Sequence, residues 1–538
     1  MLKGRIENKV VHSPHPKVSI PVCSVYTAVK SFLSVAGSKL AAVDYTTSYT
    51  RQELLLALER CAAGFQSLGV KLGDHACVHM RNSVDGFVVV FGLIFAGATV
   101  ILAKTSLTHR ELLYQMSDGD ASYIVTDPPN ADKVRKVCDE MKMPEKARCI
   151  LGEAPGFISI LGFALLDPKM FREVTVSDPR NTLAGLSYTS GTTGLPKGVE
   201  ISHYSFVANI VLSKSVTASD ETDVFLAWNP ITHMSGFLFT MLGACIGSTC
   251  VIVSPALTFN QFIDVCTKYQ VTSLFSFPTR LRSLVHEMQR MNVKLDKVRK
   301  VSVGGSLVTE TLARATMDVF PNLFNFRNFY GLTECCSLLV APGQDEIDFM
   351  DLGVPSPNVE IKFLTLDSRE QVGPKENGEL VFRTPAIMRG YYKRAKATAE
   401  VVDPAGWCFS GDMGFYDENG RIHYVERLKD MIKCMDNQVV PAELEDLISR
   451  SCPGVAEVSV VGMPHPEYGE VAAAFVILHE AYKGKVSGED IKKIVSDNLA
   501  KHKHLLGGVF FPSTLPHTDT GKVIKSVVRK DPAYTMGQ

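Results

Sequence analysis

A segment rich in hydroxyls and glycines occupies residues 187–200, Ser-Tyr-Thr-Ser-Gly-Thr-Thr-Gly-Leu-Pro-Lys-Gly-Val-Glu. Glycines allow backbone N–H groups to converge on an anion, hydroxyls donate hydrogen bonds to phosphate oxygens, and the lysine adds a mobile positive charge. The segment therefore predicts a polyphosphate-binding loop, although a flexible surface loop is the alternative. It is not a P-loop, because no Gly-Lys-Ser/Thr ends it. The predicted binding residues are Thr189, Ser190, Gly191, Thr192, Thr193, Gly194 and Lys197.

A second block of polar groups has the sequence Asn-Phe-Tyr-Gly-Leu-Thr-Glu and ends at Glu334. Tyr330 offers a flat face for a nucleotide base, and Gly331 belongs to the same binding block. Thr333 offers a hydroxyl for a phosphate, and Glu334 is the kind of oxygen ligand that Mg²⁺ prefers. On its own the block also fits a turn that ends in a solvated glutamate.

Three further candidates lie toward the C-terminus. Asp412, in a glycine-flanked turn, can accept hydrogen bonds from both hydroxyls of a ribose, and Arg427 can reach a ribose or a phosphate. Lys522 follows a glycine, where it can swing in to neutralise charge that develops on a carboxylate and an α-phosphate. Taken singly, the three also fit an Asx turn, a charged helix face or linker, and a solvated surface lysine.

The chain has 538 residues with 46% hydrophobic and 21% charged residues, so we expect a globular protein of two or more domains. A net charge of −1, two tryptophans and no basic-aromatic cluster argue against nucleic acid as a partner. Thirteen scattered cysteines without a Cys-x-x-Cys pair predict reduced thiols, and neither disulfides nor a zinc site. We expect an intracellular and most plausibly cytoplasmic protein, since a signal peptide and a C-terminal Ser-Lys-Leu are both missing.

Two uncharged stretches, Gly86–Ala103 and Ala227–Ile263, resemble membrane spans at first sight. Both contain glycines followed by a β-branched run, which favours a buried helix, a turn and a buried strand over a transmembrane helix. A peripheral membrane contact stays open. The second stretch carries His233, which on its own is more often a core histidine than a ligand.

Strand and helix patterns alternate through the first two thirds of the chain, which predicts an α/β fold with largely parallel sheets. From about Pro355 short alternating strands separated by turn residues predict a small antiparallel β subdomain. A break near Arg427–Asp430 precedes a compact α+β pattern. We therefore predict an N-terminal domain over 1–426 with its β subdomain at 355–426, a hinge at 427–431, and a C-terminal domain over 432–538.

Five blocks in this order resemble the adenylate-forming superfamily of acyl- and aryl-CoA synthetases, 4-coumarate-CoA ligase-like enzymes and beetle luciferases. They are Thr-Ser-Gly-Thr-Thr-Gly-Leu-Pro-Lys-Gly, Tyr-Gly-Leu-Thr-Glu, Ser-Gly-Asp, Glu-Arg-Leu-Lys-Asp-Met-Ile-Lys and Thr-Gly-Lys. The resemblance covers about residues 25 to 530. It implies a large domain of two stacked sheets with helices and a β subdomain, followed by a small mobile α+β domain.

The resemblance also implies a chemistry in two half-reactions. A carboxylic acid, here a medium- or long-chain fatty acid or an aryl acid, is activated by ATP and Mg²⁺ to an acyl-AMP, and coenzyme A then displaces AMP. Lys522 would serve the first step, and Lys433 the second after rotation about Lys429. His233, Ser235, Gly304 and Phe329 would border the acid.

Two departures from the family pattern bear on these expectations. Phe329 replaces a glycine and should narrow or reshape the acid pocket, and Asp436 replaces a glycine where coenzyme A would pass. The alternatives are a luciferase-like oxygenase that acts through a luciferyl-adenylate, and a nucleotide- or acyl-binding protein with impaired turnover. The protein is expected to be a monomer or a homodimer.

Overall fold

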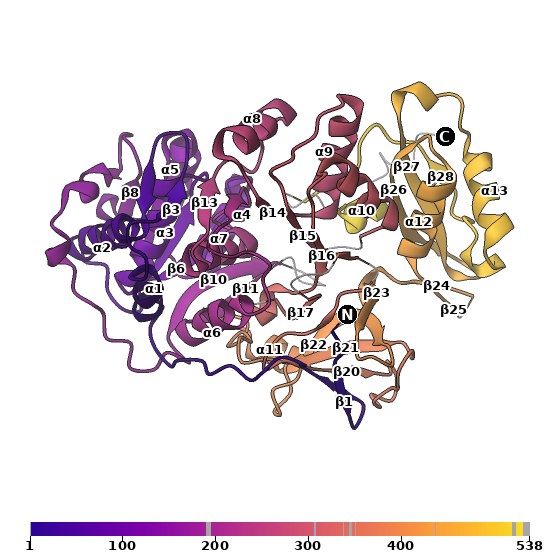
Figure 1. Ribbon diagram of the computed structural model, residues 1–538, viewed down its shortest axis with the longest axis horizontal. Helices are drawn as coiled ribbons and strands as arrows, with labels where there is room; N and C mark the ends of the chain where they lie inside the picture. The colour runs from indigo at the N-terminus through magenta and orange to yellow at the C-terminus, as the bar shows by residue number, and fades with distance from the viewer. Residues whose placement is uncertain are drawn as a thin grey trace.

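The computed structural model describes residues 2–189, 195–305, 308–336, 338–343, 347–349, 351–435, 437–518 and 523–530. Three sheets build the larger part of the molecule, and a separate C-terminal unit adjoins it (Figure 1). Two of the three sheets are mainly parallel and the third is antiparallel. The α/β class and the large and small parts expected from the sequence are confirmed.

The first sheet has seven strands in the order β11-β10-β6-β5-β7-β8-β9. All neighbours are parallel except β10 and β11, which form an antiparallel hairpin. Its strands are β5 (His75–His79), β6 (Thr99–Leu102), β7 (Tyr123–Thr126), β8 (Arg148–Ile150), β9 (Ile158–Ser159), β10 (Leu183–Thr189) and β11 (Lys197–Ser202).

The second sheet has eight strands in the order β18-β16-β15-β14-β12-β13-β3-β4, parallel except for the pair β3 and β4. Its parallel strands therefore end at one common edge, where ligands of open α/β sheets bind. The strands are β3 (Leu40–Val43), β4 (Ser48–Thr50), β12 (Val224–Ala227), β13 (Thr249–Ile252), β14 (Ser273–Ser276), β15 (Lys300–Gly304), β16 (Asn325–Phe329) and β18 (Ile347–Asp348).

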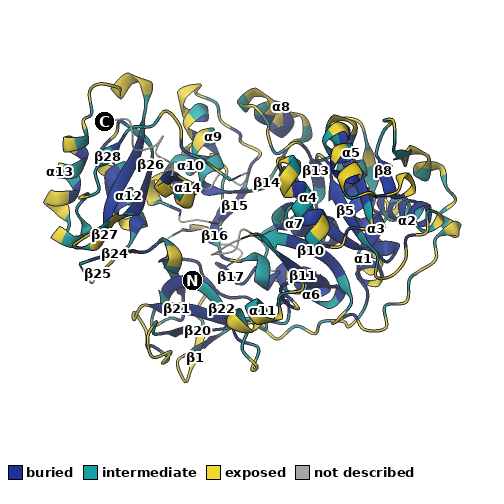
Figure 2. Ribbon diagram, turned by 180° about the vertical axis from the view of Figure 1, so that it is seen from behind, coloured by how far each residue is buried: buried dark blue, intermediate teal, exposed yellow. Residues whose placement is uncertain are grey.

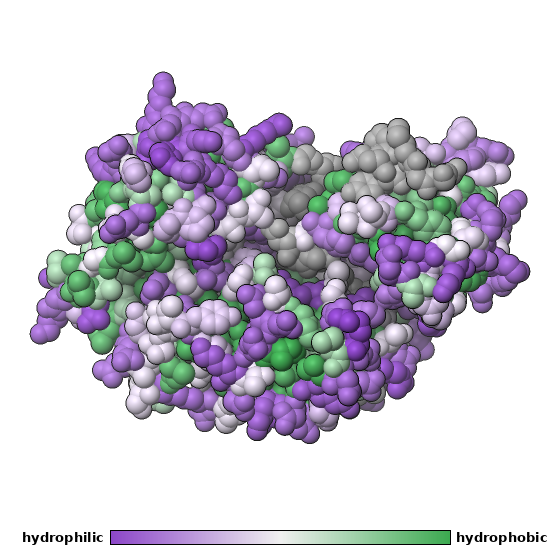
Figure 3. Space-filling model, turned by 90° about the horizontal axis from the view of Figure 1, so that it is seen from above, coloured by the Kyte–Doolittle hydropathy of each residue, from purple (hydrophilic) through white to green (hydrophobic). Residues whose placement is uncertain are grey.

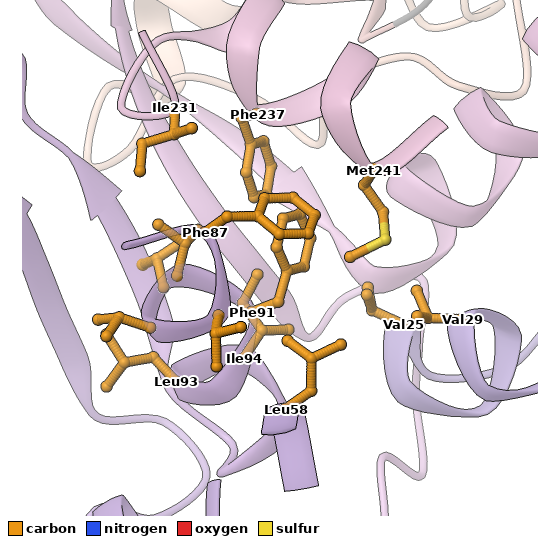
Figure 4. Packing of buried hydrophobic residues seen from close by; sticks show 14 of the residues in the cluster. Val25, Val29, Leu58, Phe87, Phe91, Leu93, Ile94, Ile231, Phe237 and Met241 are labelled. Atoms are coloured by element: carbon orange, nitrogen blue, oxygen red, sulfur yellow. The ribbon is translucent and has the colours of Figure 1, made fainter. Parts of the chain in front are cut away.

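Apolar helices fill the space between these two sheets. The ring of Phe91 on α3 stacks on that of Phe237 on α7, with centroids 5.1 Å apart (Figure 4). Each of the two helices is followed by a left-handed glycine, Gly97 or Gly247, and then by a buried strand. The helices that contribute to this core are α1 (Val25–Leu33), α2 (Arg51–Ser67), α3 (Val84–Phe95), α6 (His203–Lys214) and α7 (Met234–Ile246).

The outer helices present polar faces to solvent, whereas the strands behind them are buried (Figure 2). They are α4 (His109–Asp118), α5 (Ala131–Glu140), α8 (Phe259–Tyr269), α9 (Pro278–Arg290) and α10 (Glu310–Val319). Helix α2 begins directly after Thr50, which forms a reciprocal cap with Glu53.

The antiparallel sheet has the order β1-β2-β20-β21-β22-β23. The sequence predicted short antiparallel strands after Pro355 but placed Asp412 in a turn, whereas Asp412 lies in β22. It did not predict β1 and β2: β1 pairs with β2, and β2 pairs with β20 through Val11 and Ile361. The β subdomain thus includes residues from the N-terminus as well as from 355–426. The elements are β1 (Arg5–Glu7), β2 (Val10–His12), β20 (Glu360–Leu364), β21 (Gly378–Arg383), α11 (Ala395–Val401), β22 (Cys408–Tyr416) and β23 (Ile422–Arg427), with a small pair β17 (Val340–Ala341) and β19 (Val354–Pro355) nearby.

The C-terminal unit follows β23 after a short 3₁₀ segment, Leu428–Asp430, and has hydrophobic cores made only of its own residues. The hinge at 427–431 and the domain boundaries stay predictions. The elements are β24 (Ile432–Cys434), β25 (Asn437–Val439), α12 (Pro441–Ser451), β26 (Val455–His465), β27 (Gly469–Leu478), α13 (Gly488–Asn498), β28 (Val509–Phe510) and α14 (Lys525–Lys530).

The two uncharged stretches lie inside the fold. Gly86–Ala103 falls within α3 and β6, and 227–263 covers α7 and β13 with their flanking loops. Among the described residues, no helix has both the length and the apolar composition needed to cross a bilayer. The face seen in Figure 3 intermixes hydrophilic and hydrophobic residues.

Candidate active site

The predicted polyphosphate loop connects the two strands of the β10–β11 hairpin. Thr189 and Lys197 are partners in the last register position of that hairpin, so they stand opposite each other at the base of the loop. Ser190, Gly191, Thr192, Thr193 and Gly194 lie outside the described residues. The Lys197 ammonium lies 5.1 Å from the centroid of the Tyr391 ring, a cation–π distance.

Tyr391 connects the loop lysine to the candidate metal ligand. Its hydroxyl donates to Oε1 of Glu334 over 2.8 Å, and burial together with the Glu334 carboxylate raises the pKa of Tyr391. The tyrosine is held beside β11 by a bridge to Val199. Lys197 and Glu334, which are far apart in the sequence, therefore lie on two sides of one aromatic ring.

A second polar network surrounds the candidate ribose-binding carboxylate. The Tyr330 hydroxyl donates to Oδ2 of Asp412 over 2.5 Å, and Nε of Arg427 lies 3.5 Å from Oδ1 of the same carboxylate. Asp412 and Arg427 are register partners on β22 and β23, which explains how the antiparallel sheet positions them. Asp412 is only 2% exposed, so its charge interacts with these two groups in a poorly solvated place.

The pKa values in this network reflect the shared carboxylate. Burial and then Asp412 raise the pKa of Tyr330 well above its ordinary value, so the phenol stays a hydrogen-bond donor. Burial opposes the positive charge of Arg427, but Asp412 and the neighbouring tyrosines outweigh it and raise the pKa of the guanidinium. The network can therefore present one oriented carboxylate and one permanent cation to a ligand.

The network around Asp412 and the cluster around Glu334 meet in the loop after β16. Tyr330 follows the end of that strand, Gly331 is exposed, and Thr333 begins the 3₁₀ turn that carries Glu334. Because Tyr330 and Glu334 are four residues apart, this loop joins the network of Asp412 to the cluster of Lys197. The structure thus brings together described members of four blocks that the sequence alone could only propose.

His233 is the N-terminal cap of α7. Its Nδ1 lies 2.8 Å from the Ser235 hydroxyl and accepts the Ser235 backbone N–H at 3.3 Å. We assign the ring proton to Nε2 from this accepting role of Nδ1. Its position at the carboxyl edge of the second sheet, after β12, fits a group at the mouth of an acid pocket.

The other predicted pocket residues lie farther along the same edge. Gly304 ends β15 and Phe329 ends β16, and the two are register partners. A Cβ on Gly304 would come within 3.0 Å of the Phe329 ring, so glycine allows the ring to lie flat against β15. Phe329 packs against Phe239 and Phe275, with ring centroids 5.7 and 5.1 Å away.

A narrow cavity of about 30 Å³ lies around these rings. Phe239 is one helical turn beyond Ser235 on α7, so the helix runs from the histidine down the wall of the cavity. That volume holds about one or two water molecules, and the aromatic rings occupy the rest of the space. The deeper lining is mixed and includes Thr217, Gly243, Ile246, Ser273, Ser302 and the buried Arg327.

The remaining predicted residues do not join this cluster through any contact found in the described structure. Lys429 is exposed in the 3₁₀ segment that follows β23, and Lys433 is exposed on β24. Lys522 and Asp436 lie outside the described residues. Tyr391 was missed by the sequence analysis, because the Gly-Tyr-Tyr-Lys segment around it carries no recognisable spacing relative to Glu334.

Two family models match this chain. A family model described as AMP-binding enzyme matches residues 32–392, and one described as AMP-binding enzyme C-terminal domain matches residues 443–522. The chain belongs to the AMP-binding enzyme family. The resemblance to adenylate-forming enzymes is thereby confirmed.

Relatives of this AMP-binding enzyme have more than one activity. It is 26% identical to a probable 4-coumarate–CoA ligase of Dictyostelium discoideum, with 98% of each chain covered. It is 28% identical to a luciferin 4-monooxygenase of Luciola mingrelica, with 97% of each covered. The fold is similar to that of the anthranilate CoA ligase AuaEII in complex with anthranoyl-AMP, with a TM-score of 0.84, 21% identity and coverage of 94% and 96%.

Proposed function

We propose that the protein activates a carboxylic acid with ATP and transfers the acyl group to coenzyme A. In the first half-reaction an oxygen of the carboxylate bonds to the α-phosphorus, the bond from that phosphorus to the bridging oxygen breaks, and pyrophosphate leaves. In the second, the coenzyme A sulfur bonds to the acyl carbon, AMP leaves, and the thiol proton passes to solvent. The observation that carries this proposal is the joint network of Tyr330, Asp412 and Arg427.

That network fits the sugar end of ATP. The carboxylate of Asp412 can accept hydrogen bonds from two ribose hydroxyls, and Arg427 supplies a permanent donor beside it. Tyr330 orients the Asp412 carboxylate by donating to its Oδ2. The reaction depends mainly on positioning and on stabilising charge on phosphate oxygens, and we assign that task to Lys197, Thr333 and Lys522.

The cluster around Glu334 fits a magnesium ion. Tyr391 donates to Oε1 of Glu334, and among the described residues no hydrogen bond or ion pair is found for Oε2. An ion held there with phosphate oxygens would neutralise charge on the polyphosphate. The role of the chain is to orient the carboxylate, and the Tyr391 hydroxyl does so.

The aromatic cluster narrows the choice of acid. Phe239, Phe275 and Phe329 leave little free volume beyond the histidine, so a long acyl chain could enter only if Phe329 moved away. We therefore propose that a flat aryl acid or a short acyl chain is preferred over the medium- and long-chain fatty acids that the family resemblance also implies.

The decisive experiment measures pyrophosphate release with ATP and Mg²⁺ over a panel of aryl and fatty acids, with and without coenzyme A. We expect release for aryl or short acids, stimulation by coenzyme A, and a thioester product. Release without a thioester under any condition would contradict the second half-reaction. No release with any acid would favour an impaired nucleotide- or acyl-binding protein.

A luciferase-like oxygenase is the second candidate, because a luciferin 4-monooxygenase is 28% identical over nearly the full chain. In that reaction the acyl-adenylate would react with O₂ and not with a thiol. Adding a luciferin as the acid and recording light emission and oxygen uptake distinguishes the two. Light that requires ATP would favour the oxygenase.

A further inference from the structure

A lysine outside the family blocks bridges the two parts of the molecule. Lys525, at the start of α14, lies 3.0 Å from Oε1 of Glu445 on α12 and 3.8 Å from Oε2 of Glu426 on β23. Glu445 belongs to the C-terminal unit, whereas Glu426 is the last residue but one of β23 in the antiparallel sheet of the large part. Figure 1 shows β23 reaching from that sheet toward the C-terminal unit.

The large-part partner is itself tied to the candidate ribose site. Oε1 of Glu426 accepts the backbone N–H of Arg427 over 2.9 Å, while Oε2 faces Lys525. Arg427 in turn lies beside Asp412. Lys525 therefore holds the C-terminal unit against the strand end that positions the nucleotide-binding carboxylate.

Lys525 belongs to the C-terminal unit, so its contact with Glu426 crosses the boundary between the two parts. We propose that Lys525 is a positioning residue that holds the C-terminal unit against the nucleotide site through Glu426. This inference rests on the proposed function, since it concerns the adenylation half-reaction.

Lys525 separates two carboxylates that would otherwise repel each other. One ammonium lies between two carboxylates, and Glu426 is only 7% exposed. Without the lysine, Glu426 and Glu445 would face each other across the boundary between the two parts and repel each other. Loss of Lys525 should therefore remove an attraction between the two parts and also add a repulsion between Glu426 and Glu445. Both effects drive the two parts away from this orientation.

The chain offers a matched control. Lys503 pairs with Glu443, also on α12, at 2.7 Å, and its side chain is 24% exposed compared with 20% for Lys525. Both partners of that pair lie in the C-terminal unit. Lys503→Gln thus removes a similar ion pair from the same helix without touching the boundary.

The test measures the two half-reactions separately in the full-length protein. Lys525→Gln should slow acyl-AMP formation by at least about tenfold, whereas thioester formation from supplied acyl-AMP should stay within about twofold of the parent. Lys525→Arg should restore most of the first step, because it keeps the charge. Glu426→Gln added to Lys525→Gln should also recover part of it, because it removes the repulsion.

A Lys525→Gln variant with the same first step as Lys503→Gln would overturn the inference. So would an equal loss in both half-reactions, which indicates general damage to the fold. Tryptic cleavage after the exposed Lys429 provides a readout without activity, and Lys525→Gln should be cut several-fold faster than Lys503→Gln. If the parent released no pyrophosphate with any acid, the proposed function would fail, and equal cleavage rates would then overturn the anchor as well.

Discussion

Phe329 and Tyr330 are neighbours in the chain, but their side chains enter two differently constructed regions. Tyr330 joins a polar network in which each donor has a charged acceptor, and its residues match the family blocks. Phe329 joins an aromatic cluster at a position where the family usually has glycine. Reaction with ATP is common to the family and requires one arrangement of polar groups. The acid varies between members, and its pocket has only to match the shape of the acid.

The largest expected effect comes from breaking the polar region at Asp412. Asp412→Ala should lower the kcat/KM of acyl-AMP formation on the order of 100-fold, about 3 kcal/mol, because two charged hydrogen bonds to the nucleotide are lost. The loss should be the same for every acid that the enzyme accepts. Pyrophosphate release with two acids of different size measures it.

Tyr330→Phe is the control for that substitution. It keeps the ring and removes only the hydroxyl that donates to the carboxylate, so we expect a loss of about fivefold, near 1 kcal/mol. A loss from Asp412→Ala that depends strongly on the acid would show that the two regions are not independent.

The sequence was informative where one short segment determines the result. The helix-glycine-strand units at Gly97 and Gly247 follow from local patterns. It was uninformative where distant segments meet. Strand β2 has three residues, and its partner β20 lies almost 350 residues away, so no local pattern predicts the pairing.

The same division runs through the site itself. The motif residues Glu334 and Lys197 were predicted from chemistry, but Tyr391, which lies between them, has no motif and contacts them only in three dimensions. Lys525 is similar, since its partners are about 80 and 100 residues away. Positioning residues of this kind become visible only when the packing is known.

The second prediction concerns the aromatic region. Phe329→Gly should raise kcat/KM for an acid one methylene longer by about tenfold relative to the acid the parent prefers, since one accommodated methylene is worth roughly that much. The KM for ATP should not change. Competition between a short and a long acid in one assay measures the ratio.

Because removing a buried ring also leaves a cavity, Phe329→Leu serves as a milder companion with less effect on folding. It should shift the preference in the same direction by a smaller factor. Identical acid preferences in the parent and in both variants would contradict the idea that this ring limits the pocket.

The third prediction concerns the acceptor, not the acid. Asp436→Gly should raise the rate of thioester formation from acyl-AMP several-fold, because the anionic side chain stands where the family has glycine for coenzyme A, which is also anionic. Acyl-AMP formation should be unaffected. Asp436→Asn separates charge from size, and an unchanged thioester rate in both variants would rule out obstruction at this position.

The smallest effect is expected from Tyr391, which only orients the Glu334 carboxylate. Tyr391→Phe removes the donor to Oε1 of Glu334 and keeps the ring beside Lys197, so acyl-AMP formation should fall about fivefold, near 1 kcal/mol. The concentration of Mg²⁺ at half-maximal rate should rise, because the carboxylate is no longer held in place.

Glu334→Gln should raise this Mg²⁺ concentration far more. In the double variant it should make Tyr391→Phe nearly silent, as expected when a hydroxyl acts only through its acceptor. Additive losses would instead assign Tyr391 a contact of its own with the nucleotide and would extend the polar region by one residue.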